Sequence, residues 1–535
     1  MGSDEFDVIV VGFGCAGACA AITAADAGAS VLILDRGYGG GSTYHSGGVV
    51  YAGAGTAPQL EAGIEDTAED TFSYLRAEIG DVVSDATLRR FARGGPEMID
   101  WLQCQGLEFE GSVCPYKTSY PTNRHYLYYS GNELVSERAA VAAPAPRGHR
   151  HHAKNFSGAA FFNQLRDTAL AKGVSFRPMA EVQRLVLDDS GRVSGVEFLA
   201  PSVPLGKRHE AMFQLAAKLS IYYPPVGRRL TAIVERKRRA VSERRSARAR
   251  SAVILTTGGH AFNRRLVAEH APAWADLPPL GTIGDDGAAM RLAAPLNAKT
   301  DYLQSMSGWR FISPPSSFMA GIVVNRHGER FVNEQLYGAT MAKPLVEEHE
   351  ATGYLIMDAS TWRAAKANLR QQTAFFHAPQ MMYLFGPAGH KRAATLAGLA
   401  DKLGMNVAGL AKTVADHNAA IDVGRPDEFG KSDEFRCPLR EAPFYAIDIS
   451  FGNQPAFPAM FISLGGLVVD ESTGEVVDSA GAPITGLYAA GRSAVGLCSG
   501  SYVSGLSLAD AVFSGRRAGA HAAEAAAKTK RAAAE

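Results

Sequence analysis

The fold of this chain is decided by the stretch Asp7-Val8-Ile9-Val10-Val11-Gly12-Phe13-Gly14-Cys15-Ala16-Gly17. Four apolar, β-favouring residues run directly into a G-x-G-x-x-G turn. A small-residue segment of helical length follows, and a second apolar run ends on Asp35. In this order of strand, glycine turn, helix, strand and acid, the glycines permit a tight turn and close approach of a pyrophosphate to the backbone. The helix N-terminus offers N–H groups to the phosphates. The stretch therefore predicts a dinucleotide-binding β-α-β unit, with Asp35 on the adenosine ribose.

A second glycine-rich segment follows at residues 39–48, Gly39-Gly40-Gly41-Ser42-Thr43-Tyr44-His45-Ser46-Gly47-Gly48. Such glycine density costs chain entropy and indicates that the backbone approaches a ligand closely. The pyrophosphate and isoalloxazine of FAD are the obvious candidates. His45 could be a covalent attachment point for the flavin, but a local hydrogen-bonding role is favoured, so we expect non-covalent FAD.

The composition describes an ordinary globular protein of more than one domain. The chain has 535 residues, 46% hydrophobic and 20% charged, with a net charge of zero. This length exceeds one hydrophobic core, and the balance of charge excludes a bulk polyelectrolyte role. The six cysteines form no C-x-x-C pair, which favours reduced thiols. With no signal peptide and no run of 18 apolar residues, we expect a cytoplasmic protein, peripheral on the inner face of the membrane.

The order of segments predicts an α/β fold, namely a Rossmann-like FAD-binding domain with an inserted α+β cap domain that carries catalytic groups. Residues 251–259 read as a buried strand ending in Thr-Thr-Gly-Gly, and a last strand runs into Gly491. Between them the sequence changes to mixed strands and polar helices. We therefore expect the FAD-binding domain at 1–294 and 441–535, and the cap at 295–440.

Residues 201–250 form a strongly basic insert in the first domain. Between Lys207 and Arg250 there are 13 Lys or Arg against three Glu, and apolar residues recur with helical spacing. A cationic amphipathic hairpin of this kind suits an anionic membrane surface. A protein partner or a plain solvated excursion are the alternatives, and the interleaved apolar residues argue against nucleic acid.

Four further motifs give the chain a family resemblance. They are Thr256-Thr257-Gly258-Gly259, Gly284-Asp285-Asp286-Gly287, Gly328-Glu329-Arg330-Phe331-Val332-Asn333-Glu334 and Gly486-Leu487-Tyr488-Ala489-Ala490-Gly491-Arg492. With the N-terminal glycine turn, they resemble the FAD flavoproteins of the fumarate reductase/succinate dehydrogenase superfamily over nearly the whole chain except residues 201–250.

Two tyrosines point to one branch of that superfamily. Tyr337 follows the Asn-Glu motif, and Tyr502 stands in the last loop, Ser499-Gly500-Ser501-Tyr502-Val503-Ser504-Gly505. This is similar to the 3-ketosteroid dehydrogenases. The Δ1 members are expected to read Tyr-Pro-Gly-Pro-Gly in that loop, so this chain is closer to the Δ4-(5α) type.

The resemblance implies roles for these residues. Tyr502 would donate to the 3-keto oxygen of a steroid or sterol-derived ketone, while Tyr337 would take the neighbouring proton with Ser504 as relay. Tyr120 and Gly505 would contact the substrate. A tyrosine base needs a lowered pKa, and we expect a helix N-terminus or a cation nearby to supply it.

The glycine turn and the resemblance together assign a set of residues to FAD: Gly12, Gly14, Ala16, Gly17, Asp35, Arg36, Gly41, Ser42, Thr43, Ser46, Gly47, Gly48, Gly258, Asp286, Gly491, Arg492, Gly505, Leu506, Ser507 and Leu508. We expect no metal, because the histidines at 149–152 lack carboxylate or cysteine companions and read as a loop.

Two other functions stay open at this point. One is a flavin-dependent reductase of enones or fumarate-like substrates. The other is a membrane-attached flavoprotein subunit that passes electrons to a partner. For the dehydrogenase, an artificial or quinone-like electron acceptor is expected.

Overall fold

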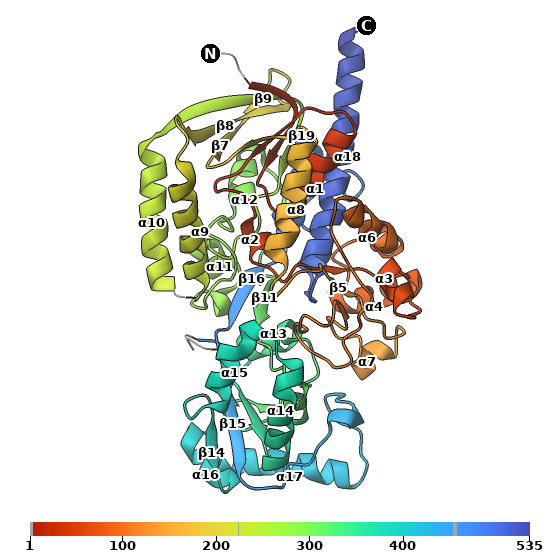
Figure 1. Cartoon of the computed structure of the whole chain (residues 1–535), viewed down its shortest axis with the longest axis vertical. Coiled ribbons are helices and arrows are strands. Elements are labelled where there is room, and N and C mark those ends of the chain that lie inside the picture. The colour runs from red at the N-terminus through yellow and green to blue at the C-terminus, as the bar shows by residue number, and fades with distance from the viewer. Residues whose placement is uncertain (1–3, 223, 453–456, 535) are drawn as a thin grey trace.

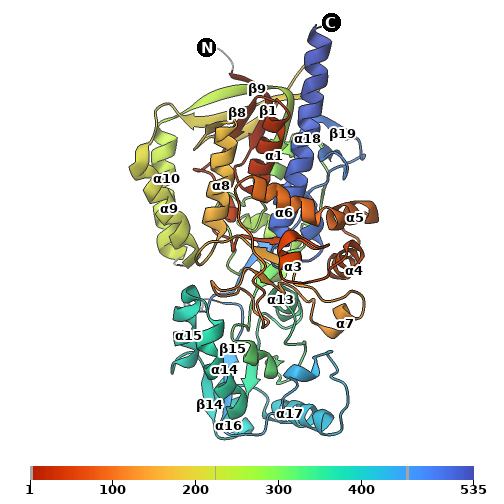
Figure 2. The same cartoon turned by 45° about the vertical axis from the view of Figure 1, so that its right-hand side comes forward.

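The computed structural model describes residues 4–222, 224–452 and 457–534 as a nucleotide domain joined to a smaller cap (Figures 1 and 2). The cap lies at one end of the molecule, below the nucleotide domain in both views. Both termini lie at the opposite end, and the closing helix projects from it.

A parallel sheet forms the centre of the nucleotide domain. Its strand order is β18-β19-β9-β1-β2-β6, and only the edge strand β18 runs antiparallel to its neighbour. The strands are β1 (Asp4–Val11), β2 (Val31–Leu34), β6 (Ser175–Arg177), β9 (Ser242–Leu255), β18 (Glu475–Val477) and β19 (Pro483–Ala489). Two further strands, β7 (Glu181–Leu187) and β8 (Val193–Pro201), continue antiparallel from β9. The α/β fold predicted from the glycine turn is confirmed.

Two helices cover one face of this sheet in very close contact. These are α1 (Cys15–Asp26) and α18 (Leu506–Ala534). A Cβ placed on Gly515 would lie 2.5 Å from the carbonyl oxygen of Ala16, and one on Gly519 would lie 2.3 Å from that of Ala20. The two helices can therefore come this close only because residues 515 and 519 have no side chain.

The cap is built on its own antiparallel sheet, in the order β12-β13-β15-β14. Its strands are β12 (Ile322–Val324), β13 (Tyr354–Met357), β14 (Lys391–Ala393) and β15 (Phe444–Asp448). The helices around it are α14 (Ala359–Gln372), α15 (Ala378–Phe385), α16 (Leu396–Leu403) and α17 (Val407–Asp422). We expected the cap to end near residue 440. Strand β15 follows that position and still pairs within the cap sheet, so the cap extends beyond it.

A two-stranded ribbon joins the cap to the nucleotide domain. The chain enters the cap along β11 (Met306–Trp309) and returns along β16 (Met460–Ser463), and the two strands pair antiparallel. Helix α13 (Gly338–Glu347) packs against β11. The ribbon and α13 thus form the junction.

The remaining elements pack around the central sheet of the nucleotide domain. One small sheet contains β3 (Val49–Tyr51), β5 (Gly148–Arg150) and β4 (Leu127–Tyr128). His149 is therefore buried in a strand and bonded to Thr56, so the expectation of a loop at 149–152 was wrong there. The helices are α2 (Gly41–Tyr44), α3 (Ala57–Glu61), α4 (Ala68–Ile79), α5 (Asp85–Arg93), α6 (Gly95–Cys104), α7 (Ser136–Ala139), α8 (Gly158–Ala171), α11 (Arg264–His270) and α12 (Ala288–Ala293).

The basic insert forms a helical hairpin of α9 (Gly206–Tyr222) and α10 (Pro224–Ala240), which flanks the nucleotide domain (Figure 1). The insert does not extend to residue 250, because residues 242–250 belong to β9 and pair with β8 and β1. Among the residues that the structure describes, no helix combines the length and hydropathy needed to cross a bilayer.

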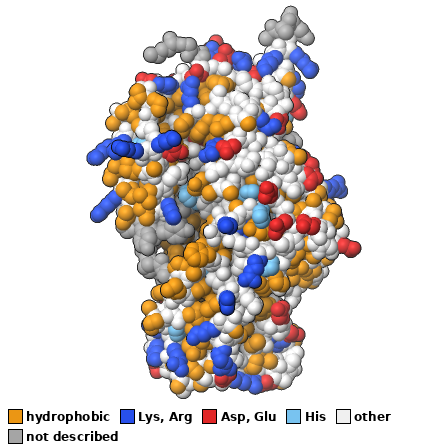
Figure 3. Space-filling model, viewed as in Figure 1, with side chains coloured by type: hydrophobic (Ala, Val, Ile, Leu, Met, Phe, Trp, Pro, Cys, Tyr) orange, Lys and Arg blue, Asp and Glu red, His pale blue; other side chains and the backbone are white. Residues whose placement is uncertain are grey.

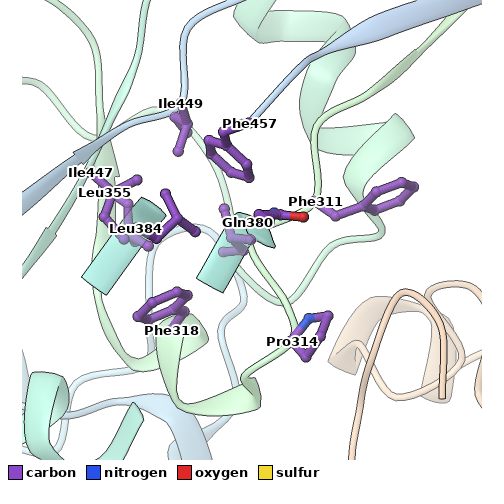
Figure 4. A pocket seen from close by; sticks show the side chains of 10 residues that line it. Phe311, Pro314, Phe318, Leu355, Gln380, Leu384, Ile447, Ile449 and Phe457 are labelled. Atoms are coloured by element: carbon purple, nitrogen blue, oxygen red, sulfur yellow. The ribbon is translucent and has the colours of Figure 1, made fainter. Parts of the chain in front are cut away.

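An apolar cavity in the cap lies among side chains such as Phe318, Leu384 and Ile447 (Figure 4). These residues belong to the hydrophobic core of the cap. The cavity measures about 10 Å³, which is room for no more than one water. It is a packing defect of the core, and Phe311, which also lines it, packs against Tyr337 with ring centroids 5.2 Å apart.

Candidate active site

The glycine turn has the geometry that a bound pyrophosphate requires. Gly12 has a φ of +104°, and a Cβ on it would lie 2.4 Å from the carbonyl oxygen of Thr256. A Cβ on Gly17 would lie 2.1 Å from the Gly12 carbonyl oxygen, so α1 packs directly on the turn. Helix α1 begins without a side-chain cap at Gly14, and the space beside Gly14 is open to 3.5 Å. The N-terminus of α1 is therefore available to an anion.

Asp35, the predicted ribose acid, also holds the turn in place. Its carboxylate accepts hydrogen bonds from the backbone N–H groups of Phe13 (2.7 Å) and Gly37 (2.7 Å). A carboxylate offers about four acceptor positions, so capacity is left for ribose hydroxyls. The acid thus links the glycine turn to the segment that follows β2.

Asp285 is the centre of the predicted cofactor residues, although the sequence analysis chose its neighbour Asp286. The buried Asp285 carboxylate accepts from Ser42 Oγ (2.6 Å), from the Gly259 N–H (3.0 Å) and from Arg492 Nη2 (2.7 Å). Asp286 instead pairs with Arg36 at 2.9 Å. Two adjacent acids in one motif gave no signal to tell them apart.

Arg492 supplies an unsatisfied donor in this cluster. Its Nη1 is buried without a hydrogen-bond partner, although Nη2 is paired with Asp285. A buried guanidinium N–H without a partner is costly and suits an anionic group such as a phosphate. The preceding Gly491, at a φ of +60°, donates its N–H to Ser514 Oγ. The open N-terminus of α1 and this donor fit FAD.

Tyr120 packs against the loop that follows α2. The buried hydroxyl of Tyr120 lies 2.8 Å from the carbonyl oxygen of Gly47 and 3.0 Å from that of Asn155. A Cβ on Gly47 would lie 2.6 Å from the Tyr120 ring. The Tyr120 hydroxyl therefore already has hydrogen-bond partners in the backbone and holds the loop in place. Its contact with substrate stays a prediction.

Tyr337, Tyr502 and Ser504 lie close together, and their catalytic roles stay a prediction. The rings of Tyr337 and Tyr502 are buried with centroids 6.3 Å apart, and Ser504 lies close enough to the Tyr337 hydroxyl to lower the pKa of that group. Ser504 Oγ lies 3.1 Å from the hydroxyl of Tyr128, which the sequence analysis missed. Three hydroxyls, those of Tyr337, Ser504 and Tyr128, thus lie near one another, and the last two are hydrogen-bonded.

One extended segment positions both Tyr337 and Ser504. Ser130 Oγ donates to the Ser504 carbonyl oxygen (3.0 Å), and the Ser504 N–H donates back to Ser130 (3.2 Å). Asn132 Oδ1 accepts from the Tyr337 N–H (2.6 Å), while its Nδ2 donates to Thr340 Oγ1 (3.0 Å). Together with Tyr128, the alternate residues of one stretch fix the geometry.

Burial raises the pKa of Tyr337 well above its usual value, and nearby Tyr502 and Tyr128 raise it further. Burial also raises the pKa of Tyr502. The expectation that a cation or helix terminus lowers the pKa of the base was therefore wrong for the protein alone. Tyr337 precedes α13, but loss of water outweighs any such effect.

The Asn-Glu motif before Tyr337 anchors the cap. The buried Glu334 carboxylate pairs with Arg330 (2.7 Å) and Lys431 (2.9 Å), and accepts from the Val323 N–H (2.7 Å). Removing one member of a buried ion cluster is strongly destabilising, so this motif has a structural role in the cap.

A family model described as "FAD binding domain" matches residues 7–505. The chain is 40% identical over 504 residues to the 3-oxo-5-alpha-steroid 4-dehydrogenase of Comamonas testosteroni, which covers 91% of this chain and 93% of that protein. It is also 26% identical over 532 residues to a probable fumarate reductase, Ifc3, of Shewanella frigidimarina, covering 98% of this chain and 75% of that protein.

Among solved structures, the chain is similar to the 3-ketosteroid-Δ4-(5α)-dehydrogenase of Rhodococcus jostii RHA1 in complex with 4-androstene-3,17-dione. The TM-score is 0.81 at 29% sequence identity, and the match covers 97% of each chain. The likeness therefore extends over both the nucleotide domain and the cap.

Proposed function

The chain belongs to the FAD binding domain family, in the branch of the 3-ketosteroid dehydrogenases, and we propose that it introduces a ring-A double bond into 3-ketosteroids, at Δ4 rather than Δ1. The cofactor is FAD. The observation that carries the proposal is the buried pair Tyr337 and Tyr502 beside Ser504, in a protein that is similar over 97% of its length to a Δ4-(5α) enzyme.

Residues of the nucleotide domain would hold FAD. The N-terminus of α1 and Arg492 would contact the pyrophosphate, and Asp35 the adenosine ribose. When bound, the flavin supplies a hydride acceptor at N5. FAD is expected to be non-covalent, and His45 to act locally.

The protein's own groups would activate the substrate. Tyr502 would donate a hydrogen bond to the 3-keto oxygen, so that removal of the neighbouring C4 proton leaves a stabilised enolate oxygen. Tyr337, in its ionised form, would accept that proton, with Ser504 beside it as the relay towards solvent. Loss of the C4 proton together with a hydride from C5 leaves the C4=C5 double bond.

The proposal is tested by anaerobic mixing of the purified protein with a 3-keto-5α-steroid. Flavin absorbance should bleach rapidly, and Tyr502→Phe should slow bleaching by roughly 10²–10³-fold, as loss of an oxyanion donor does elsewhere. No bleaching, with reduced enzyme instead reoxidised by a 4-ene-3-ketosteroid, would favour an enone reductase. Turnover of a dicarboxylate would favour a fumarate-like reductase. The 26% identity to Ifc3 is the observation behind this second candidate.

The outer face of the hairpin supports a second proposal, attachment to an anionic membrane surface. The side chains of Leu215, Val226 and Ile233 are 51%, 51% and 38% exposed, and Figure 3 shows basic side chains among hydrophobic ones over this region. Exposed apolar groups amid cations suit an anionic lipid interface. A quinone-like acceptor dissolved in the same membrane would then receive the electrons.

The membrane proposal is tested by sedimentation with anionic vesicles. The triple variant Leu215→Ser, Val226→Ser and Ile233→Ser should lose vesicle binding, while its flavin content stays unchanged. Neutral phosphatidylcholine vesicles serve as the control for the charge requirement. Equal sedimentation of the variant and the wild type would contradict this proposal without touching the proposed reaction.

A further inference from the structure

The inner face of the hairpin is built against the nucleotide domain. The sequence suggested that the apolar residues of 206–222 share one exposed stripe, but Phe213 and Ala216 turn inward while Leu215 faces solvent. The Phe213 ring packs edge-on against Tyr38, with centroids 5.5 Å apart. A Cβ on Gly37 would lie 2.5 Å from the Phe213 ring. The two faces of the hairpin therefore do different things.

A buried histidine connects both helices of the hairpin to the same loop. The Nε2 of His209 lies 3.2 Å from the carbonyl oxygen of Val234, which can only accept, so Nε2 carries the hydrogen. In the neutral ring Nδ1 is then an acceptor, and it lies 2.9 Å from the hydroxyl of Tyr38. The order Tyr38, His209, Val234 thus runs from the loop through α9 to α10.

Alternating charges make a second connection. The guanidinium of Arg238 on α10 is fully buried between Glu235 (2.8 Å) and Glu181 (2.6 Å). Glu181 also faces Arg36 at 3.8 Å, and Arg36 pairs with Asp286 at 2.9 Å. Each charge lies between opposite charges, and the series leads from the hairpin to the residue next to Asp35.

Both connections end on the segment that the dinucleotide fingerprint assigns to adenosine. Asp35 is the ribose acid of that fingerprint, and its carboxylate accepts from the N–H of Gly37. The loop is further fixed by the Met179 N–H, which donates to the Gly37 carbonyl oxygen (2.7 Å), and by the Ala180 N–H, which donates to that of Asp35 (2.7 Å).

We propose that the α9–α10 hairpin is a clamp on the adenosine end of the FAD site, with His209 and Arg238 as positioning residues for the loop at 35–39. The inner face holds the loop in the conformation that receives the ribose, and the outer face remains free for other contacts. Retention of FAD therefore depends on a segment outside the motifs shared with the family.

The test measures binding of FAD and of FMN, which lacks the adenosine. Protein stripped of flavin is titrated with each cofactor, and quenching of flavin fluorescence gives the dissociation constant. Tyr38→Phe and His209→Ala should each raise that of FAD about tenfold, the scale of one buried hydrogen bond left incomplete. Binding of FMN should not change, because the hairpin does not reach its phosphate or ring.

The double variant and a matched control sharpen the result. Tyr38→Phe combined with His209→Ala should weaken FAD binding no more than His209→Ala alone, because His209→Ala already removes the bond that Tyr38→Phe removes. Arg228→Gln, at an exposed position of α10, should leave both constants unchanged. Equal weakening of FAD and FMN would mean general destabilisation and would overturn the clamp, as would unaltered FAD binding. Neither readout uses a steroid, so the outcome is independent of the proposed reaction.

Discussion

Ser504→Ala removes one hydroxyl from the middle of the proposed proton path. Ser504 Oγ lies 3.1 Å from the Tyr128 hydroxyl and is close to that of Tyr337. The backbone of residue 504 is held separately by Ser130, so the loop should keep its place. Acid–base groups contribute about 10²–10⁴-fold to a rate, and because Tyr337 remains we expect the lower end, about 10²-fold or roughly 2.7 kcal/mol of barrier.

The assay is anaerobic stopped-flow reduction of the flavin by a 3-keto-5α-steroid, which isolates the chemical half-reaction from reoxidation. Ser504→Ala should slow bleaching about 100-fold while the FAD content stays equal to that of the wild type. Ser501→Ala removes the same group three residues earlier in the loop and should reduce at the wild-type rate. A Ser504→Ala rate within twofold of the wild type would refute the relay and leave Tyr337 to lose its proton by another route.

Three further outcomes follow from the site and the packing. Because burial raises the pKa of Tyr337, the ionised base is scarce at neutral pH, and the rate of flavin reduction should climb with pH from 7 towards 10; in Tyr337→Phe the slower rate should be flat over this range, and a plateau near pH 7 in the wild type would contradict the assignment. Asp285→Ala should raise the dissociation constant of FAD at least tenfold, since it frees Ser42, the Gly259 N–H and Arg492 together, whereas Asp286→Ala should act more weakly; equal effects of the two in a fluorescence titration would count against this. Gly519→Ala should cost about 1–3 kcal/mol of unfolding free energy in a denaturant titration, because its Cβ meets the Ala20 carbonyl oxygen at 2.3 Å, and an unchanged midpoint would show that α18 can shift.

The sequence predicted the parts of the site that depend on local backbone. Gly12 and Gly17 need no side chain for reasons that the G-x-G-x-x-G spacing already states, and the structure places them against Thr256 and against each other. Tyr337, Tyr502 and Ser504 were found through the family resemblance, and they meet in space.

The remaining parts depend on contacts between distant segments. Tyr128 belongs to the site only because its strand lies beside residue 504, which is 376 positions away. Asp285 and Asp286 are chemically identical, and the direction of each side chain follows from the turn of the chain. In the hairpin, helical periodicity placed Phe213 and Leu215 on one stripe, but Phe213 packs against Gly37 while Leu215 is exposed.

The tie from Asn132 to Tyr337 has a mechanical consequence. The cap hangs from the nucleotide domain on β11 and β16, and α13, which starts just after Tyr337, lies on that ribbon. In a swing about the ribbon, displacement grows with distance from it. The far helices α16 and α17 would travel most, and α13, which begins just after Tyr337, least (Figure 2). Movement of the outer cap would thus admit a steroid while Tyr337 and Tyr502 keep their spacing. The reacting groups would be in position before the cap closes.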